Sequence, residues 1–275
     1  MKALISVDME GISGIVHSSE TNPERYDYQR GRELMTAEAN AVIAGVLDAE
    51  PTADVLVADA HGTFRNLLPE QLDRRARLVR GKPRALNMLA GLDEETDAAL
   101  FVGYHVRAGE GPGVLAHTMN GEILDVRVTG RSLGEIGLNA AMAGHLGVPV
   151  VLLSGDDAAC AEAAALIPEA VTVPVKEALG MAAAVTLHPE EARDRLRRAA
   201  ADAVSRRTEI PPLALTGPLD VEVDLASPHT IDLATLVPGV SRTAGARTVA
   251  FTAPDYGTAY RLILLLAQLA TIRPA

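Results

Sequence analysis

The sequence has few aromatic residues and only one cysteine. Its 275 residues include no tryptophan, three phenylalanines and five tyrosines, so few rings are available to stack on nucleobases. The lone cysteine, Cys160, excludes an intramolecular disulfide, and we expect a reducing, cytoplasmic location. Because Cys160 follows two aspartates on a predicted alanine-rich helix, we interpret it as a small buried residue and not as a catalytic thiol.

Long apolar runs and clusters of basic residues are also missing. No apolar stretch approaches the ~20 residues of a membrane span, and the chain begins directly with a predicted strand, so we expect neither a secretion signal nor a membrane partner. The formal net charge of −11 argues against a nucleic-acid partner. Glycine-rich dinucleotide and phosphate-binding motifs are missing, and so is the Gly-x-Ser-x-Gly motif of serine hydrolases.

Four short, strongly apolar runs end abruptly at a carboxylate or a histidine. Such runs, separated by helical patterns, are typical of buried parallel strands. They cover residues 3–7, 55–58, 99–104 and 150–153. The sequence therefore predicts an α/β fold with a mostly parallel sheet and flanking helices.

The C-terminal part has a different pattern. Residues 210–212 read Ile-Pro-Pro and are the best linker candidate, and a β-α-β-β-α order follows them. We therefore predict a metal-binding α/β catalytic domain over 1–208 and a small α+β subdomain over 209–275. Within the first domain, the pattern also predicts helices over 31–49 and 133–145 and near 69–76.

The polar residues that end the apolar runs suggest a metal site. Asp8 and Glu10 follow the first run, His61 follows the second and His105 ends the third. The carboxyl ends of parallel strands share one edge of the sheet, so we expect these four side chains to converge. Two carboxylates and two imidazoles suit a pair of divalent metals, with zinc as the default. Taken one at a time, these residues would fit turn capping, solvation or a structural role equally well.

Such a site also needs a further metal ligand and a catalytic acid or base, for which Glu135 and His117 are the candidates. Glu135 lies in the first turn of a predicted helix, where it could bind metal or simply complement the helix dipole. His117 closes the glycine-rich loop 106–116 that begins after His105, a placement that suits a mobile acid or base.

Other polar residues receive structural interpretations or secondary roles. Asp59, Asp156 and Asp157 could orient a metal-bound imidazole or could serve as turn or helix caps. Four further histidines are interpreted as turn, helix-end or undirected residues: His17, His145, His188 and His229.

Six short blocks together resemble the zinc-dependent D-aminopeptidase family of the dipeptide-transport operon. They are Ser-Val-Asp-Met-Glu-Gly-Ile-Ser-Gly at 6–14, Asp-Ala-His-Gly at 59–62, Gly-Tyr-His at 103–105, His-Thr-Met at 117–119, Gly-Glu-Ile-Gly-Leu-Asn-Ala at 134–140 and Ser-Gly-Asp-Asp at 154–157. The blocks follow the family's order, whereas the C-terminal part carries no such motif. The loop 106–116 is longer and more glycine-rich than we expect of the family.

The resemblance implies a di-zinc aminopeptidase that releases N-terminal D-residues, D-alanine above all, from short peptides and amides. Five residues would bind two zinc ions per chain: Asp8 between them, Glu10 and Glu135 at one site, and His61 and His105 at the other. His117 would be the catalytic histidine. The resemblance also implies a homo-oligomer, a decamer of two stacked pentameric rings whose active sites face an inner chamber.

Two other classes of function stay open at this point. A di-metal hydrolase of phosphoesters would need Arg or Lys around the metals, and Arg107 is the only candidate nearby in sequence. A non-catalytic peptide-binding or metal-binding protein would have no use for His117.

Overall fold

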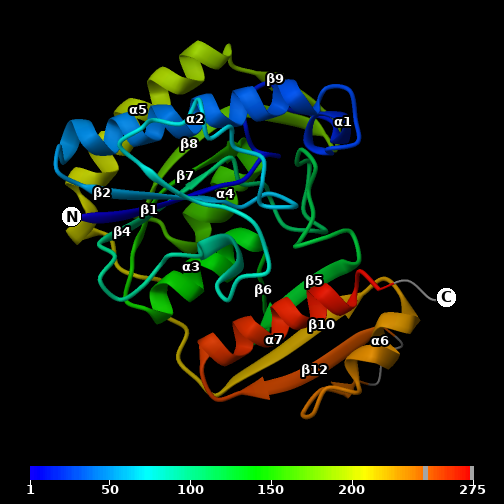
Figure 1. Cartoon of the computed structure of the whole chain (residues 1–275). Coiled ribbons are helices and arrows are strands. Elements are labelled where there is room, and N and C mark those ends of the chain that lie inside the picture. Colours follow the sequence, from blue (N-terminus) through cyan, green and yellow to red (C-terminus); the bar gives the residue numbers. More distant parts are fainter. Residues whose placement is uncertain (244–246, 273–275) are drawn as a thin grey trace.

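The computed structural model describes residues 1–243 and 247–272 and contains two β-sheets (Figure 1). The larger sheet has the strand order β3-β2-β1-β4-β7-β8-β9, and every neighbouring pair is parallel except β8 and β9. Its strands are β1 (Lys2–Val7), β2 (Asp54–Asp59), β3 (Arg77–Val79), β4 (Ala98–Val102), β7 (Val150–Asp156), β8 (Val171–Gly180) and β9 (Ala183–Thr186). The predicted mostly parallel α/β fold is confirmed.

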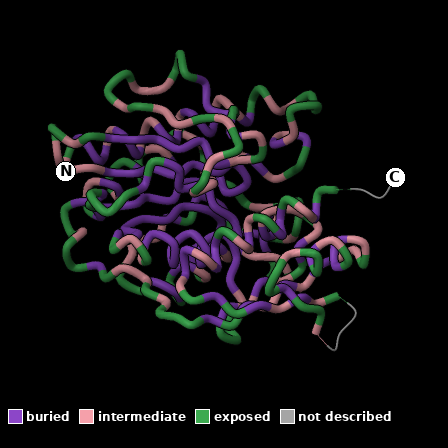
Figure 2. Tube along the Cα trace, turned by 60° about the horizontal axis from the view of Figure 1, so that its bottom comes forward, coloured by how far each residue is buried: buried purple, intermediate pink, exposed green. Residues whose placement is uncertain are grey.

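Helices cover both faces of this sheet (Figure 1). Alternate residues of β1 point to opposite faces: Ala3, Ile5 and Val7 join one hydrophobic cluster, whereas Leu4 joins the other. The first cluster contains α2 (Tyr28–Ala49) and α5 (Pro189–Ser205), and the second contains α3 (Glu135–His145) and α4 (Asp157–Leu166). Figure 2 shows the resulting buried layer through the middle of the molecule. The shorter helices are α1 (Ser18–Thr21), η1 (Asn87–Leu89) and η2 (Arg207–Glu209).

The smaller sheet is antiparallel, with the order β11-β12-β10-β5-β6. Its strands are β5 (Ile123–Val128), β6 (Arg131–Ser132), β10 (Leu219–Leu225), β11 (Ser241–Arg242) and β12 (Thr248–Ala253), accompanied by α6 (Pro228–Ala234) and α7 (Tyr256–Leu269). The predicted α+β character of the C-terminal part is therefore present. Because β5 pairs with β10, this sheet draws strands from both sides of the predicted boundary at 208.

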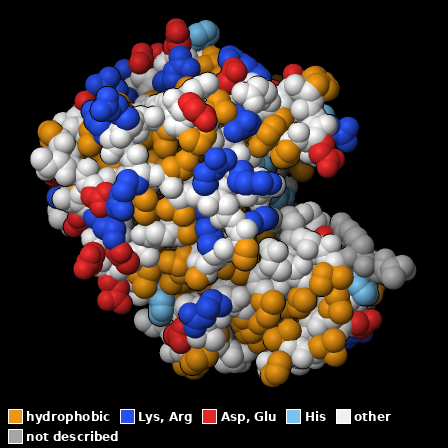
Figure 3. All heavy atoms as spheres, in the orientation of Figure 1, with side chains coloured by type: hydrophobic (Ala, Val, Ile, Leu, Met, Phe, Trp, Pro, Cys, Tyr) orange, Lys and Arg blue, Asp and Glu red, His pale blue; other side chains and the backbone are white. Residues whose placement is uncertain are grey.

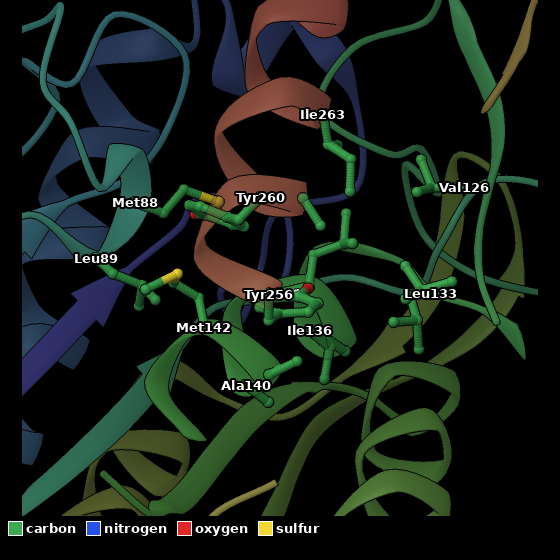
Figure 4. Packing of buried hydrophobic residues seen from close by; sticks show 14 of the residues in the cluster. Met88, Leu89, Val126, Leu133, Ile136, Ala140, Met142, Tyr256, Tyr260 and Ile263 are labelled. Carbon is green, nitrogen blue, oxygen red and sulfur yellow. Dashed lines mark hydrogen bonds between the residues drawn. The ribbon is translucent and has the colours of Figure 1, made fainter. Parts of the chain in front are cut away.

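The molecule has two halves, one built on the larger sheet and one on the smaller sheet. Helix α7 of the smaller-sheet half packs on α3 of the larger-sheet half and so joins the two (Figure 4). The Tyr256 hydroxyl donates to the Leu138 carbonyl at 2.9 Å, and the Tyr260 hydroxyl donates to the Asn139 side-chain oxygen at 2.6 Å. Hydrophobic side chains gather on the lower half of the space-filling view, below a notch between the two halves (Figure 3). Among the described helices, none is long and apolar enough to cross a membrane.

Three local features differ from the sequence pattern. Residues 69–76 form turns instead of the predicted helix, because Asn40 of α2 hydrogen-bonds the Gln71 carbonyl and the Asp73 amide. Strands β8 and β9 were not predicted, since β8 mixes polar and apolar residues and β9 is a short strand with no buried residue. His229 lies inside α6 and not in a turn.

Candidate metal centre

Side chains from three strand ends and one helix start meet at the carboxyl edge of the larger sheet. They are Asp8 and Glu10 after β1, His61 after β2, His105 after β4, and Glu135 at the start of α3. Nδ1 of His61 lies 3.0 Å from a Glu10 oxygen and 3.4 Å from an Asp8 oxygen. Nε2 of His105 lies 3.5 Å from the other Asp8 oxygen and 3.4 Å from a Glu135 oxygen. The structure thus brings together all five residues singled out as metal ligands.

Two glycines allow the loop after β1 to lie directly against the end of β4. The Gly11 amide donates to the Gly103 carbonyl at 2.8 Å, and a Cβ on Gly11 would lie 2.0 Å from the Tyr104 carbonyl oxygen. Gly103 has a φ of +69°, a conformation that L side chains rarely adopt. This close backbone approach brings Asp8 within reach of His105.

Each of three imidazoles has one nitrogen at hydrogen-bonding distance from a backbone carbonyl. The pairs are His61 Nε2 with Thr21 at 2.9 Å, His105 Nδ1 with Val106 at 3.0 Å, and His117 Nδ1 with Leu115 at 2.9 Å. Because a carbonyl only accepts, the proton of each neutral ring belongs on that nitrogen. The other nitrogen faces the carboxylates and would offer its lone pair to a metal bound between them, which is the orientation that metal-binding histidines adopt.

His117 lies at the edge of this centre and not in its interior. Its ring stacks on that of His105, with centroids 4.1 Å apart and planes 12° from parallel. Its Nε2 is 3.7 Å from a Glu135 oxygen. The His117 side chain is 28 % exposed, compared with 1 % for His105, so His117 can reach a molecule in the adjoining cavity.

The charges in the centre shift one another's pKa values strongly. Burial and the neighbouring Glu10 carboxylate raise the pKa of Asp8 to about 7. Burial opposes protonation of His105, but Glu135, Asp8 and Glu10 together outweigh it and raise the pKa of His105 to about 10. Burial likewise opposes ionisation of Glu10 and Glu135, but the facing imidazoles hold the pKa of each carboxyl below its usual range. Opposite charges therefore compensate one another at very short range.

The donor set fits divalent metal ions. Within the described residues, Asp8 Oδ2 and His105 Nε2 are buried and have no hydrogen-bond partner. Leaving such a group unpaired costs about 1–3 kcal/mol, which a bound cation would offset. Two sets of three ligand atoms lie within 4.8 Å of one another: Asp8, Glu10 and His105, and His105, His117 and Glu135. Mixed carboxylate and imidazole ligation is typical of zinc.

The three secondary aspartates hold loops and do not contact the imidazoles. Asp59 accepts hydrogen bonds from the amides of Asn66 and Leu67, in the loop after His61. Asp156 caps α4 and also accepts from the Val114 amide at 2.7 Å, which fixes the glycine-rich loop before His117. Asp157 accepts from the Ala178 amide. Their turn and cap interpretations are therefore the ones that the contacts favour.

The other singled-out residues lie outside the centre. His17 and His188 are the N-caps of α1 and α5, and His145 ends α3. Cys160 is buried on α4, in keeping with its interpretation as a small core residue. Burial raises the pKa of its thiol to about 12, which disfavours the reactive thiolate.

A cavity of about 340 Å³ opens above the centre, between the two halves of the molecule. Sequence reasoning missed two of its contributors. One is α7, which supplies Leu264, Ala267 and Gln268, because its apolar pattern does not reveal which element it faces. The other is Lys82. Only the small number of lysines in the sequence could have drawn attention to this residue. A buried lysine on β8, Lys176, was also missed.

Comparisons with known proteins cover nearly the whole chain. Residues 1–265 match the family model described as D-aminopeptidase. The chain is 37 % identical over 270 residues to a D-aminopeptidase of Bacillus subtilis (strain 168), covering 98 % of each protein. It also superposes on the solved structure of the Zn-dependent D-aminopeptidase DppA from Bacillus subtilis, described as a self-compartmentalizing protease. The TM-score is 0.96 at 36 % identity, with 100 % of both chains covered.

Proposed function

The chain belongs to the D-aminopeptidase family, and from this premise we propose that it is a zinc-dependent peptidase that releases N-terminal D-residues from short peptides and amides. D-alanine is the preferred residue, as the sequence resemblance implies. One observation carries the proposal. Asp8 Oδ2 and His105 Nε2, two atoms that can bind a metal, are buried without a hydrogen-bond partner beside a cavity of small-molecule size.

Two zinc ions per chain would be held by Asp8, Glu10, His61, His105 and Glu135. The carboxylate of Asp8 lies between the two histidines, which supports its role as the bridging ligand. The shortest distances group Glu10 with His61 and Glu135 with His105. We therefore propose that each ion would take one glutamate and one histidine, which differs from the pairing of the two glutamates that the resemblance implied.

Bound zinc would supply a Lewis acid for the scissile carbonyl and a water molecule of lowered pKa. The chain's own residues orient the reaction around it. The Leu115 carbonyl accepts from His117 Nδ1 and thereby holds the ring with Nε2 toward Glu135. From there, His117 either protonates the departing amine or donates a hydrogen bond to the developing oxyanion.

The cavity limits which peptides can be processed. Its 340 Å³ is near the lower end of the ~300–1,000 Å³ typical of small-molecule sites. Apolar Leu264 and Ala267 of α7 line it, so the C-terminal part shapes the substrate site without supplying a metal ligand.

The enzyme works as a homo-oligomer in the cytoplasm, and the family resemblance points to the stacked pentamers of a decamer. The solved relative is described as self-compartmentalizing, which supports a closed assembly. Three exposed apolar residues lie on or between β8 and β9, at one edge of the larger sheet: Leu179, Met181 and Val185. We name these three residues the hairpin patch and assign it to a contact between subunits.

The alternative functions are not favoured. A phosphoesterase would need basic groups beside the metals, but Arg107 is paired with Glu110 and does not line the cavity, and the exposed Lys82 belongs to the outer rim of the cavity. A purely binding protein would leave the outward-facing His117 without a role.

The test is hydrolysis of matched D-alanyl and L-alanyl amides by the zinc-reconstituted protein. Strong preference for the D form is expected. Activity on neither amide, with two zinc ions bound, would contradict the peptidase assignment while leaving the metal centre in place.

A further inference from the structure

The two ends of the cavity differ in the residues that line them. Asp8 and Glu135 line it at the buried end, where their side chains are 3 % and 6 % exposed. Lys82 lines it and is exposed, so its ammonium belongs to the outer rim. Among the described residues, it is the only Lys or Arg in the cavity lining. Because bound zinc would neutralise the carboxylates of the buried end, Lys82 supplies the charge that a substrate meets at the outer end.

Lys82 differs from the other two lysines of the chain in having no polar partner. Lys2 forms an ion pair with Asp93, and the buried Lys176 donates to three backbone carbonyls. For Lys82, the contacts within residues 1–243 and 247–272 include no hydrogen bond or ion pair, and its ammonium lies 5.5 Å from the Phe64 ring centre. The group is thus held against an aromatic ring with its hydrogen-bond donors free.

Lys82 also marks the place where the cavity meets a second one. That second cavity, of about 360 Å³, shares Lys82, Asn87, Leu264 and Gln268 with the first. Its other basic residue, Arg84, is already engaged, because its guanidinium donates to the carbonyls of Asn87, Val79 and Asp59. The side-chain amide of Gln268 has no hydrogen-bond partner among the described residues. The ammonium of Lys82 and the side-chain amide of Gln268 therefore both have free hydrogen-bond donors where the two cavities meet.

An aminopeptidase cuts next to the amino end of its substrate, so that end must lie at the metal centre and the remaining chain must extend toward the rim. We propose that Lys82, assisted by Gln268, binds the C-terminal carboxylate of a short peptide and makes free peptides better substrates than amidated ones. This inference rests on the aminopeptidase function proposed above. With the amino end at the metal centre, the C-terminal carboxylate of a short peptide would lie at the ammonium of Lys82.

The experiment compares D-Ala-Gly with D-Ala-Gly-amide, and D-Ala-Gly-Gly with its amide, on the zinc-loaded enzyme. A charge-assisted hydrogen bond at a partly exposed site corresponds to about a tenfold effect in kcat/KM. We therefore expect the wild-type enzyme to prefer at least one free acid over its amide by about that factor. Lys82→Met should abolish this preference and keep the zinc content at the wild-type level. Lys82→Arg should retain most of the preference.

Arg80→Gln is the matched control, because it removes a nearby exposed positive charge that lines neither cavity. It should keep the preference for the free acid. Equal kcat/KM for acid and amide in the wild type, or an equal loss on both in Lys82→Met, would overturn the role of Lys82. Hydrolysis of neither substrate by the wild type would instead reject the proposed function. Calorimetric binding of the same pairs would then still decide whether Lys82 recognises a carboxylate.

Discussion

The ammonium of Lys176 donates a hydrogen bond at 2.5 Å to the backbone carbonyl of Glu10, a residue 166 positions earlier in the chain. The same ammonium donates to the carbonyls of Ile12 and Ile15 at 2.9 and 2.5 Å. Lys176 is only 3 % exposed, and its burial lowers its pKa to about 8. One side chain from β8 therefore holds the loop that carries two of the proposed zinc ligands.

Lys176→Met should release this loop and weaken zinc binding. Three buried carbonyls would lose their donor, and each unpaired group costs about 1–3 kcal/mol. We expect lower zinc content by elemental analysis together with a lower free energy of unfolding in urea. Lys2→Met, which removes an ion pair at the opposite end of β1, should keep full zinc content. Full zinc content in Lys176→Met would show that the loop holds its shape without the ammonium.

His117→Ala should keep zinc but lose turnover. Because His117 is proposed to donate a proton or a hydrogen bond, kcat should fall by about 10²–10⁴-fold. Glu135→Ala serves as the comparison, since removal of a proposed ligand should release roughly one zinc ion per chain. If zinc is lost from His117→Ala instead, His117 is a metal ligand, in line with its place in one of the two ligand clusters.

Asp224→Asn should reduce stability in a pH-dependent way. The Arg127 guanidinium contacts Asp224 at 2.7 and 2.9 Å and lowers the pKa of that carboxyl below its ordinary 3.8. The stabilisation is therefore fully present above the unfolded-state pKa and disappears as the pH falls through the folded-state value. For this partly exposed pair we expect about 1 kcal/mol at neutral pH.

The measurement is the difference in urea unfolding free energy between wild type and Asp224→Asn, at neutral pH and below pH 3.8. The difference should shrink in acid. Asp220→Asn on the same strand is the control, because Asp220 contacts the Thr252 hydroxyl and no arginine. A difference that is the same at both pH values would show that the ion pair does not contribute.

Met181→Asp and Val185→Asp should each lower the oligomeric mass. The two side chains are 58 % and 59 % exposed in the hairpin patch, and a buried unpaired carboxylate would be costly in a subunit contact. Light scattering or sedimentation would report the mass. Leu236→Asp, on the other half of the molecule, is expected to assemble normally although Leu236 is 77 % exposed. Unchanged mass in both hairpin variants would place the subunit contact elsewhere.

The sequence was sufficient to predict the central strands of the larger sheet, but not β8 and β9 at its edge, and to predict the meeting of most proposed ligands. The apolar runs that overlap β1, β2, β4 and β7 are readable because strands buried on both faces need continuous apolar residues. Asp8, His61 and His105 converge for an equally general reason, since parallel strands end at one edge whatever their order. For Glu135 the sequence pattern left metal binding and a helix-dipole role open, and only the family resemblance favoured metal binding.

The three-dimensional contacts decided what no local pattern contains. The pairing of β5 with β10, the grouping of Glu10 with His61, and the wall that α7 builds over the centre all join segments distant in sequence. Lys176 and Lys82 look alike as isolated lysines, yet one is buried on three carbonyls and the other lines a cavity with its donors free. Burial and polar partners come from packing between elements, so they depend on the tertiary structure and not on the neighbours of a residue along the chain.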